Sequence, residues 1–130
     1  MFTGKEGRFL ATQEARALRR AYRDRKPNLS DDECVRSEFF GRENLEKILA
    51  VPGCVGVRVY HAKRPEVING TEHLVPRVVL VGVDENGDDI RTFADMPVAG
   101  LKDMPSDNDT QSAELGDGPI CPPNCSKGKP

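Results

Sequence analysis

Residues 52–61, which read PGCVGVRVYH, decide the fold because the sequence changes here from a helical to a strand pattern. Pro52 and Gly53 are typical of the end of a helix. Val55, Val57 and Val59 then recur at every second position, which predicts a strand over residues 54–61 with one apolar face. The segment therefore divides the chain into a helical part before it and a sheet after it.

The part after this segment predicts a β-meander. Residues 77–84 (RVVLVGVD) form a nearly continuous apolar run, which is typical of a central strand. Asn86-Gly87 predicts a two-residue type I′ hairpin turn, and a shorter strand over residues 89–93 then pairs back. Residues 62–73 contain Pro65 and Asn69-Gly70, and we expect them to form a connection.

The part before the segment predicts two helices. The first spans residues 12–25, with Thr12 as its N-cap and an apolar stripe of Ala11, Ala15, Leu18 and Tyr22. Lys26-Pro27 ends it, because proline disfavours helical geometry in the preceding residue. The second helix spans residues 42–50, with Leu45, Ile48 and Leu49 facing inward, and Phe39 and Phe40 before it are expected core anchors.

The order of these elements predicts an α+β fold. Two N-terminal helices pack on a three- or four-stranded antiparallel meander, the fourth strand lying near Val98. Residues 1–95 are the expected compact domain. Residues 96–130 are the expected flexible tail, which is acidic, rich in proline and glycine, and ends in a Cys-x3-Cys pair.

We expect the protein to be cytoplasmic, with its cysteines made in a reducing compartment. Its 130 residues suit one domain, and hydrophobic residues make up 37% of them. The N-terminus has no apolar run typical of a secretory signal. The longest apolar stretch, residues 78–83, is far shorter than the about 20 residues that cross a bilayer, so we expect no membrane association.

Charge is distributed unevenly along the chain. Residues 5–26 contain eight basic and three acidic side chains, whereas residues 84–117 contain ten acidic and two basic ones. Four arginines of the first helix share an arc of about 100°, which predicts an anion or partner contact; they are Arg16, Arg19, Arg20 and Arg23. A solvated helix face is the ordinary alternative. Nucleic acid is the less favoured partner, since the net charge is -2 and aromatic residues make up only 5%.

The four cysteines and two histidines allow a metal site. Cys121 and Cys125, together with His61 or Cys54 from the sheet, are the candidate zinc ligands. The pair is also compatible with free thiols or with a local disulfide under oxidising conditions. Cys34 and Cys54 are as readily explained as small buried residues. Zinc is thus a possible cofactor, and no other cofactor is expected.

Four short motifs of the sequence carry a resemblance to a set of small bacterial proteins. They are FFGRE (39–43), PGCVGVRVY (52–60), VLVGVDENG (79–87) and CPPNC (121–125). The chain resembles these uncharacterised, Bacteroidetes-type proteins over about residues 39–125. The resemblance implies one intact domain that includes the cysteine tail, and it supplies no activity and no catalytic residues.

No catalytic motif stands out, so an enzyme has no support at the level of residues. We therefore expect a small non-enzymatic interaction or accessory protein that binds a protein partner or a second copy of itself. One alternative is a zinc-stabilised binding module that uses Cys121 and Cys125. The other is a nucleic-acid adaptor that uses the arginines of the first helix.

Overall fold

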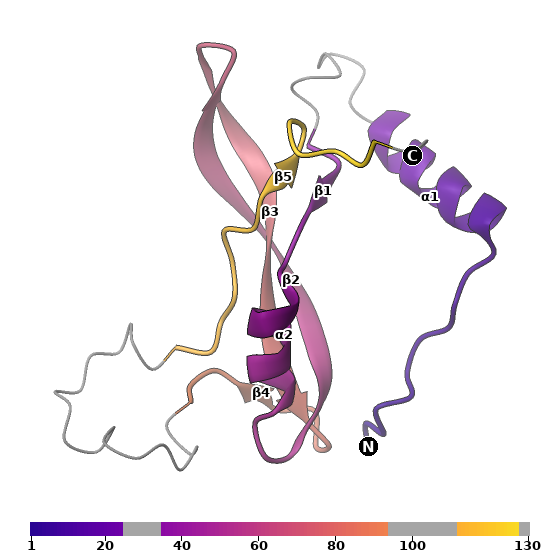
Figure 1. Cartoon of the computed structure of the whole chain (residues 1–130), viewed down its shortest axis with the longest axis vertical. Coiled ribbons are helices and arrows are strands. Elements are labelled where there is room, and N and C mark those ends of the chain that lie inside the picture. The colour runs from indigo at the N-terminus through magenta and orange to yellow at the C-terminus, as the bar shows by residue number, and fades with distance from the viewer. Residues whose placement is uncertain (25–34, 94–111, 128–130) are drawn as a thin grey trace, which may run out of the picture. The chain divides into compact units, whose positions relative to one another are not determined.

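The computed structural model of the chain describes residues 1–24, 35–93 and 112–127. It confirms a mixed α+β chain with two helices, one three-stranded antiparallel sheet and one two-stranded sheet (Figure 1). The elements are α1 (Thr12–Asp24), β1 (Ser37–Glu38), α2 (Arg42–Leu49), β2 (Cys54–Ile68), β3 (Thr71–Asp84), β4 (Asp89–Ile90) and β5 (Ile120–Cys121). The expected fourth strand near Val98 and the Lys26-Pro27 stop lie outside the described residues.

The chain forms two compact units. The described residues of the first are 1–6, 41–61, 78–93 and 112–116, and those of the second are 7–24, 35–40, 62–77 and 117–127. The strands β2 and β3 each contribute residues to both units. Residues 112–127, which the sequence assigns to the tail, pair with strands in both units. The predicted boundary between the compact domain and the tail, at residue 95, stays a prediction.

The hairpin of β2 and β3 is much longer than the sequence predicts (Figure 1). The expected connection over residues 62–73 is wrong, because both strands continue through it to a tight turn at Asn69-Gly70. Asn69 has φ 53° and Gly70 has φ 80°, which is the pair of positive values that a type I′ turn requires. The sequence did not predict strands here because Pro65 and the charged residues are untypical of a strand. An edge strand nevertheless tolerates both.

The first unit has its core between α2 and β3. Ile48 of α2 is 3% exposed, and Val81 and Val83 of β3 are 0% and 4% exposed. A Cβ atom on Gly82 would lie 3.0 Å from Ile48 Cγ2 and 3.1 Å from Cys54 Sγ, so the missing side chain lets the helix approach the strand. Of the three expected inward residues of α2, Leu45 is partly buried and Leu49 is 49% exposed.

The turn between β3 and β4 contains Asn86-Gly87, but its type differs from the prediction. Gly87 N–H donates to Asp84 O at 3.0 Å, and Asp84 N–H donates to Asp88 O at 3.0 Å. Only Gly87 has a positive φ, 86°, so the loop is a three-residue one that ends in a glycine bulge. The Asp84 carboxylate explains this choice, because it accepts the N–H groups of Asn86 and Asp88 and stabilises the longer loop.

Residues 112–116 complete the first unit. The expected third strand over residues 89–93 is shorter, since β4 ends at Ile90 and a single bridge joins Thr92 to Ser112. A second bridge joins Leu80 of β3 to Leu115, and its two N–H···O bonds measure 2.8 and 2.9 Å. Ala113 between them is 4% exposed. A segment of acidic, strand-poor sequence therefore adds to the sheet beside β3.

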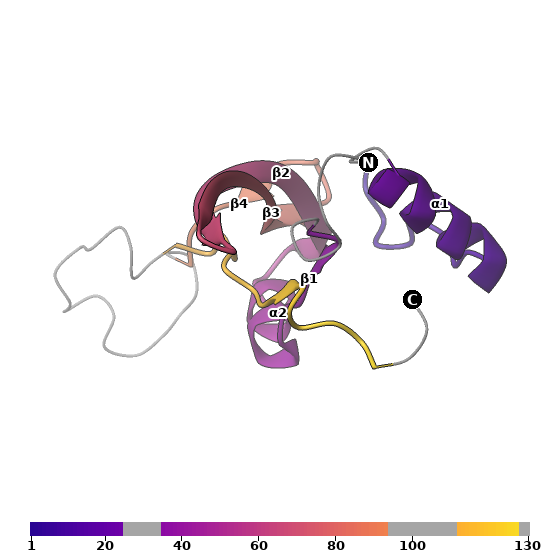
Figure 2. The same ribbon diagram turned by 90° about the horizontal axis from the view of Figure 1, so that it is seen from above.

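The second unit contains the antiparallel pair of β1 and β5, which lie side by side in Figure 2. Val35, Val75 and Cys121 are its buried apolar side chains, with exposures of 7%, 2% and 8%. The expected core position of Phe39 is wrong, since its side chain is 64% exposed. Phe39 contributes its backbone instead, since its N–H donates to Pro119 O at 2.8 Å beside the pairing of β1 with β5.

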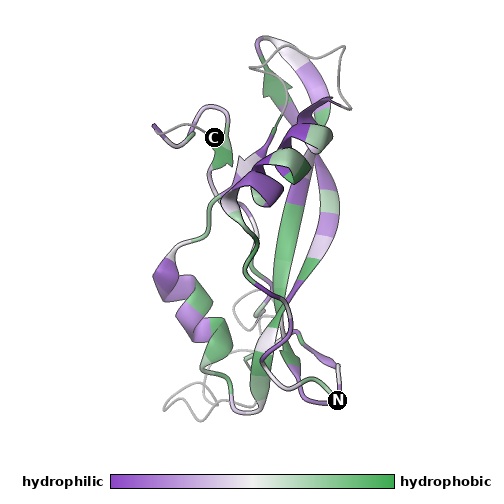
Figure 3. Cartoon of the chain, turned by 90° about the vertical axis from the view of Figure 1, so that its right-hand side faces the viewer, coloured by the Kyte–Doolittle hydropathy of each residue, from purple (hydrophilic) through white to green (hydrophobic). Residues whose placement is uncertain are grey.

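The two helices differ in burial. Both carry hydrophobic and hydrophilic bands, which Figure 3 shows in green and purple. Ile48 is the buried residue of α2, whereas α1 has none, so the expected packing of a helix on the sheet is observed for α2. The first helical hydrogen bond of α1 runs from Ala15 N–H to Ala11 O at 2.9 Å. Ala11 is therefore the capping residue, and Thr12 is the first helical one.

Candidate functional site

The helix α1 has the two faces that the sequence predicts. Its regular turn over residues 12–24 places four arginines on an arc of about 100°, which we call the arginine face: Arg16, Arg19, Arg20 and Arg23. Arg16, Arg19 and Arg20 are exposed and Arg23 is half-buried. None of the four guanidinium groups forms a salt bridge with another residue that the structure describes.

The acidic residue at the start of α1 has its own partner. Arg8 donates two hydrogen bonds to Glu14, from Nη1 at 3.2 Å and from Nη2 at 2.9 Å. This bidentate pair lies on a different side of the helix from the arginine face, because Glu14 and Arg19 are about 140° apart around the axis at 100° per residue. The other acidic residue of α1, Asp24, forms no salt bridge with an arginine of this face.

Exposed apolar side chains occur on α1 and just before it. Leu18, from the stripe that the sequence predicts, is 59% exposed. The two residues that precede the stripe, Phe9 and Leu10, are 104% and 40% exposed. A helix with adjacent cationic and apolar exposed faces has the composition of a docking surface, since arginine and large apolar residues are enriched in protein interfaces.

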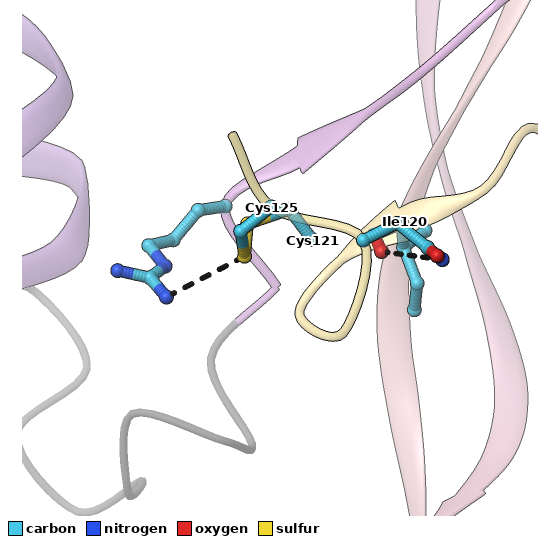
Figure 4. The surroundings of a disulfide bond; sticks show 5 residues. Ile120, Cys121 and Cys125 are labelled. Atoms are coloured by element: carbon cyan, nitrogen blue, oxygen red, sulfur yellow. Dashed lines mark hydrogen bonds between the residues drawn. A yellow bond between two sulfur atoms is a disulfide. The ribbon is translucent and has the colours of Figure 1, made fainter. Parts of the chain in front are cut away.

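The cysteine pair at the end of the chain is joined by a disulfide (Figure 4). The Cα atoms of Cys121 and Cys125 are 4.7 Å apart, and residues 121–125 form a small loop that we call the cysteine loop. Cys121 is buried at 8% exposure, whereas Cys125 is exposed. Arg36 places Nη2 3.9 Å from the Cys125 sulfur. A disulfide is one of the states that the sequence allows for this pair.

The other candidate zinc ligands lie on one strand of the first unit. Cys54 and His61 are both in β2, seven residues apart, and at about 3.3 Å per residue they are separated by roughly 23 Å. Cys54 and His61 therefore cannot both bind the same metal ion. Cys54 donates its S–H to Gly56 O at 3.3 Å. Within residues 1–24, 35–93 and 112–127 no three His, Cys, Asp or Glu side chains are grouped as metal ligands. The zinc site stays a prediction. Cys34 lies outside the residues that the structure describes.

A buried cluster of charges in the second unit is not predicted by the sequence. The Arg77 cluster contains two arginines and three acids: Arg64, Arg77, Glu38, Glu66 and Asp117. Arg77 lies 3.2 Å from Glu38 and 3.6 Å from Glu66, and it is 9% exposed. Arg64 pairs with Glu66 and Asp117 at the exposed side of the cluster. One feature of the sequence could have indicated this cluster. Arg77 begins an apolar strand, and a charged side chain that points into the core needs buried partners of opposite charge.

A second group of charges lies in the first unit around Asp89. Its carboxylate accepts a hydrogen bond from the Tyr60 hydroxyl and pairs with Arg58 at 2.5 Å and with Arg91 at 2.9 Å. The Tyr60 hydrogen bond, followed by the two guanidinium charges, lowers the pKa of Asp89. The guanidinium of Arg91 also lies 5.6 Å from the centre of the Tyr60 ring. These contacts join β2 to β4, which lie on opposite sides of β3 in the sheet.

The N-terminal residues border a shallow cavity of about 320 Å³ in the first unit. Phe2 N–H donates to Glu85 O at 2.9 Å, and the Phe2 ring lies 5.8 Å from the Arg58 guanidinium carbon. The lining residues are Phe2, Gly4, Glu6, Val55, Gly56, Val57, Arg58 and Val83. With the N-terminal residues on one side and β2 on the other, this cavity is closed in part by the chain itself.

Comparison with known proteins finds no match to this chain among protein-family models, curated proteins or solved structures. No helix among the described residues is both long enough and apolar enough to cross a membrane.

Proposed function

We propose that this protein is a small non-enzymatic interaction protein whose docking element is α1 and whose partner is an acidic protein surface. The observation that supports the proposal is the arginine face itself. Four guanidinium groups share one side of a helix, and none of them forms a salt bridge with a described residue.

The spacing of these arginines supports an anionic partner. Arg16 and Arg20 are four residues apart, as are Arg19 and Arg23. Like charges at this spacing destabilise an isolated helix by about 0.2–0.5 kcal/mol for each pair. An acidic partner removes this repulsion, so binding and helix formation support each other.

The exposed apolar side chains support a protein rather than a simple anion. Leu18 and the fully exposed Phe9 offer apolar area that an ion or a solvated polyanion backbone does not cover. A protein groove covers both the apolar and the cationic face of such a helix. We therefore expect acidic residues around an apolar groove on the partner.

The partner we propose is a second copy of this chain, because its sequence contains an acidic stretch of its own. Residues 84–117 contain ten acidic and two basic side chains. Among the described residues, Glu85 and Asp88 are exposed on the loop that joins β3 to β4. Charge complementarity between α1 of one copy and this acidic stretch of another favours association at low ionic strength.

Sedimentation velocity of the full chain over a wide concentration range, at low and at high salt, tests the proposal. We expect a larger species that forms with concentration at low salt and dissociates at high salt. Arg16→Glu combined with Arg20→Glu removes the association, because it reverses two charges of the arginine face. Arg42→Glu, an exposed arginine at the start of α2, is the matched control and leaves association unchanged.

Two outcomes overturn the proposal. A monomer at every concentration in low salt removes the second copy as partner. Binding of a labelled single-stranded DNA oligonucleotide, steeply weakened by salt and abolished by the same double substitution, would instead support the nucleic-acid adaptor. Circular dichroism of each variant shows whether α1 still forms, so that loss of binding is separated from loss of the helix.

A further inference from the structure

We propose that Cys121 and Cys125 form a reversible dithiol–disulfide site that exchanges with thiols, with Cys125 as the attacked sulfur and Arg36 as the group that stabilises its thiolate. The substrates are low-molecular-weight or protein thiols and disulfides. The site is separate from the arginine face, and the inference does not depend on the docking role of α1.

The two sulfurs differ in accessibility. Cys125 is exposed, whereas Cys121 lies in β5 at 8% exposure. Thiol–disulfide exchange requires a thiolate to reach one sulfur, and the rate depends on that access. The difference in exposure therefore makes Cys125 the point of entry and Cys121 the sulfur that closes the bond from inside.

Arg36 lies beside the accessible sulfur. Its Nη2 is 3.9 Å from Cys125 Sγ, and its Nε is buried without a hydrogen-bond partner among the described residues (Figure 4). A neighbouring guanidinium favours a thiolate over a thiol, and the thiolate is the reactive form of cysteine. The contact is therefore weak in the disulfide and becomes stronger when Cys125 is released as a thiolate.

Backbone contacts hold Arg36 and the cysteine loop together. Arg36 N–H donates to Cys121 O at 2.8 Å, next to the pairing of Ser37 with Cys121 between β1 and β5. Inside the loop, Asn124 N–H donates to Ile120 O at 2.9 Å and Cys125 N–H donates to Pro123 O at 3.0 Å. None of these hydrogen bonds requires the disulfide, so the loop can keep the two sulfurs close when the bond is open.

The chemistry of the exchange balances with two thiols. A thiolate attacks Cys125 Sγ, the bond between the two cysteine sulfurs breaks, and Cys121 leaves with the electron pair and takes a proton. A second thiolate attacks the sulfur of the first thiol in the mixed disulfide and releases Cys125 as a thiolate. Two thiols are thereby oxidised to one disulfide, and the protein disulfide is reduced to two thiols. The reverse sequence closes the bond.

The short span of the bond agrees with this role. A bond that closes a five-residue loop removes less conformational entropy from the unfolded chain than one that closes a long loop, and therefore stabilises the fold less. A reversible site explains such a bond better than a stabilising one.

Equilibration of the full chain with mixtures of reduced and oxidised glutathione tests the inference, with the state of each cysteine read by alkylation and peptide mass mapping. We expect the bond to open and close as the glutathione ratio changes, while circular dichroism reports a folded chain throughout. In oxidised glutathione, Cys121→Ser should take up glutathione at Cys125, and Cys125→Ser should take up far less at the buried Cys121. The titration of the unaltered chain remains decisive if either variant fails to fold.

The role of Arg36 has its own readout. Arg36→Gln in the Cys121→Ser background should slow the reaction of Cys125 with oxidised glutathione about threefold, which is the size expected of one exposed charge pair. Arg42→Gln in the same background is the matched control and should leave the rate unchanged. Equal rates for the Arg36→Gln and Arg42→Gln variants would overturn the role of Arg36.

Two results overturn the site as a whole. One is a disulfide that opens only when the chain unfolds, which makes it a structural bond. The other is stoichiometric zinc in the native mass spectrum of the reduced chain, with both thiols protected from alkylation until a chelator is added, which makes the pair a metal site.

Discussion

The guanidinium group of Arg77 in β3 lies 3.2 Å from the carboxylate of Glu38 in β1, and the two side chains are 9% and 5% exposed. Gly118, two residues before β5, is bound to both. Its N–H donates to Glu38 at 2.9 Å, and its C=O accepts from Arg77 at 3.0 Å. Two side chains therefore join β3, β1 and the segment that leads into β5 at one buried point of the second unit.

Removal of the Arg77 charge is expected to destabilise the protein strongly. Arg77→Met keeps much of the side-chain volume but leaves Glu38 buried without its cation, and breaking one partner of a buried pair costs about 3–5 kcal/mol. Urea denaturation measures the loss in the free energy of unfolding. Arg64→Met is the matched control, because Arg64 is 45% exposed and its pairs are worth about 0–1 kcal/mol.

A second variant separates the charge from the packing. Glu38→Gln added to Arg77→Met removes the uncompensated carboxylate. The double variant should therefore lose less free energy of unfolding than the two single variants lose together. If Arg77→Met is no less stable than Arg64→Met, the buried pair is not what holds these segments together.

Local apolar patterns decided which elements of this fold could be predicted from the sequence. Apolar periodicity located both helices to within one residue at their ends, because each has a stripe at helical spacing and a clear stop. It also located the apolar end of β3, residues 77–84. The outer halves of β2 and β3 were not predicted, because prolines and charged residues interrupt them and no apolar alternation marks them.

The candidate sites also differ in whether local spacing or contacts between distant residues form them. The arginine face follows from spacing along one helix, and α1 has that spacing. Arg77 and Glu38 are 39 positions apart in the chain, and Arg36 and Cys125 are 89 positions apart. Nothing local in the sequence pairs such residues, since their proximity depends on how β1 meets β5. The pairing of Cys121 with Cys125 could only be left as one of several states.

Gly118 is expected to tolerate no side chain. A Cβ atom there would overlap Phe39 O, a backbone atom that cannot move without separating β5 from β1. Gly118→Ala should therefore cost about 1–3 kcal/mol or more in the free energy of unfolding. Amide hydrogen exchange should also show faster exchange at Phe39, whose N–H donates to Pro119 O.

Gly116→Ala is the matched control for this substitution. Its Cβ atom would lie 3.9 Å from Val78 O, which is an ordinary contact, so we expect a change within about 0.5 kcal/mol. Equal stability of the two alanine variants would mean that β1 and β5 are not held as closely as their hydrogen bonds indicate.

Asp89 should make the stability of the protein depend on pH in the acidic range. The Tyr60 hydroxyl, with the Arg58 and Arg91 charges, stabilises the ionised carboxylate and lowers its pKa in the folded chain. A carboxyl group in an unfolded chain has a pKa of about 3.9. Folding therefore favours the ionised form, and its contribution is present above about pH 4 and is lost as pH falls through the lower, folded-state value.

Comparison of Asp89→Asn with the unaltered chain checks this sign. The variant should be less stable near neutral pH, because an amide accepts hydrogen bonds from Tyr60 and two guanidinium groups more weakly than a carboxylate does. The difference in urea midpoint should shrink as the pH is lowered below about 4, since the unaltered carboxyl then loses its charge as well. Asp88→Asn, at an exposed position of the same turn, is the control and should show a small, steady difference. A gap between Asp89→Asn and the unaltered chain that stays constant down to the lowest pH would show that the ionised carboxylate is not the source of the stabilisation.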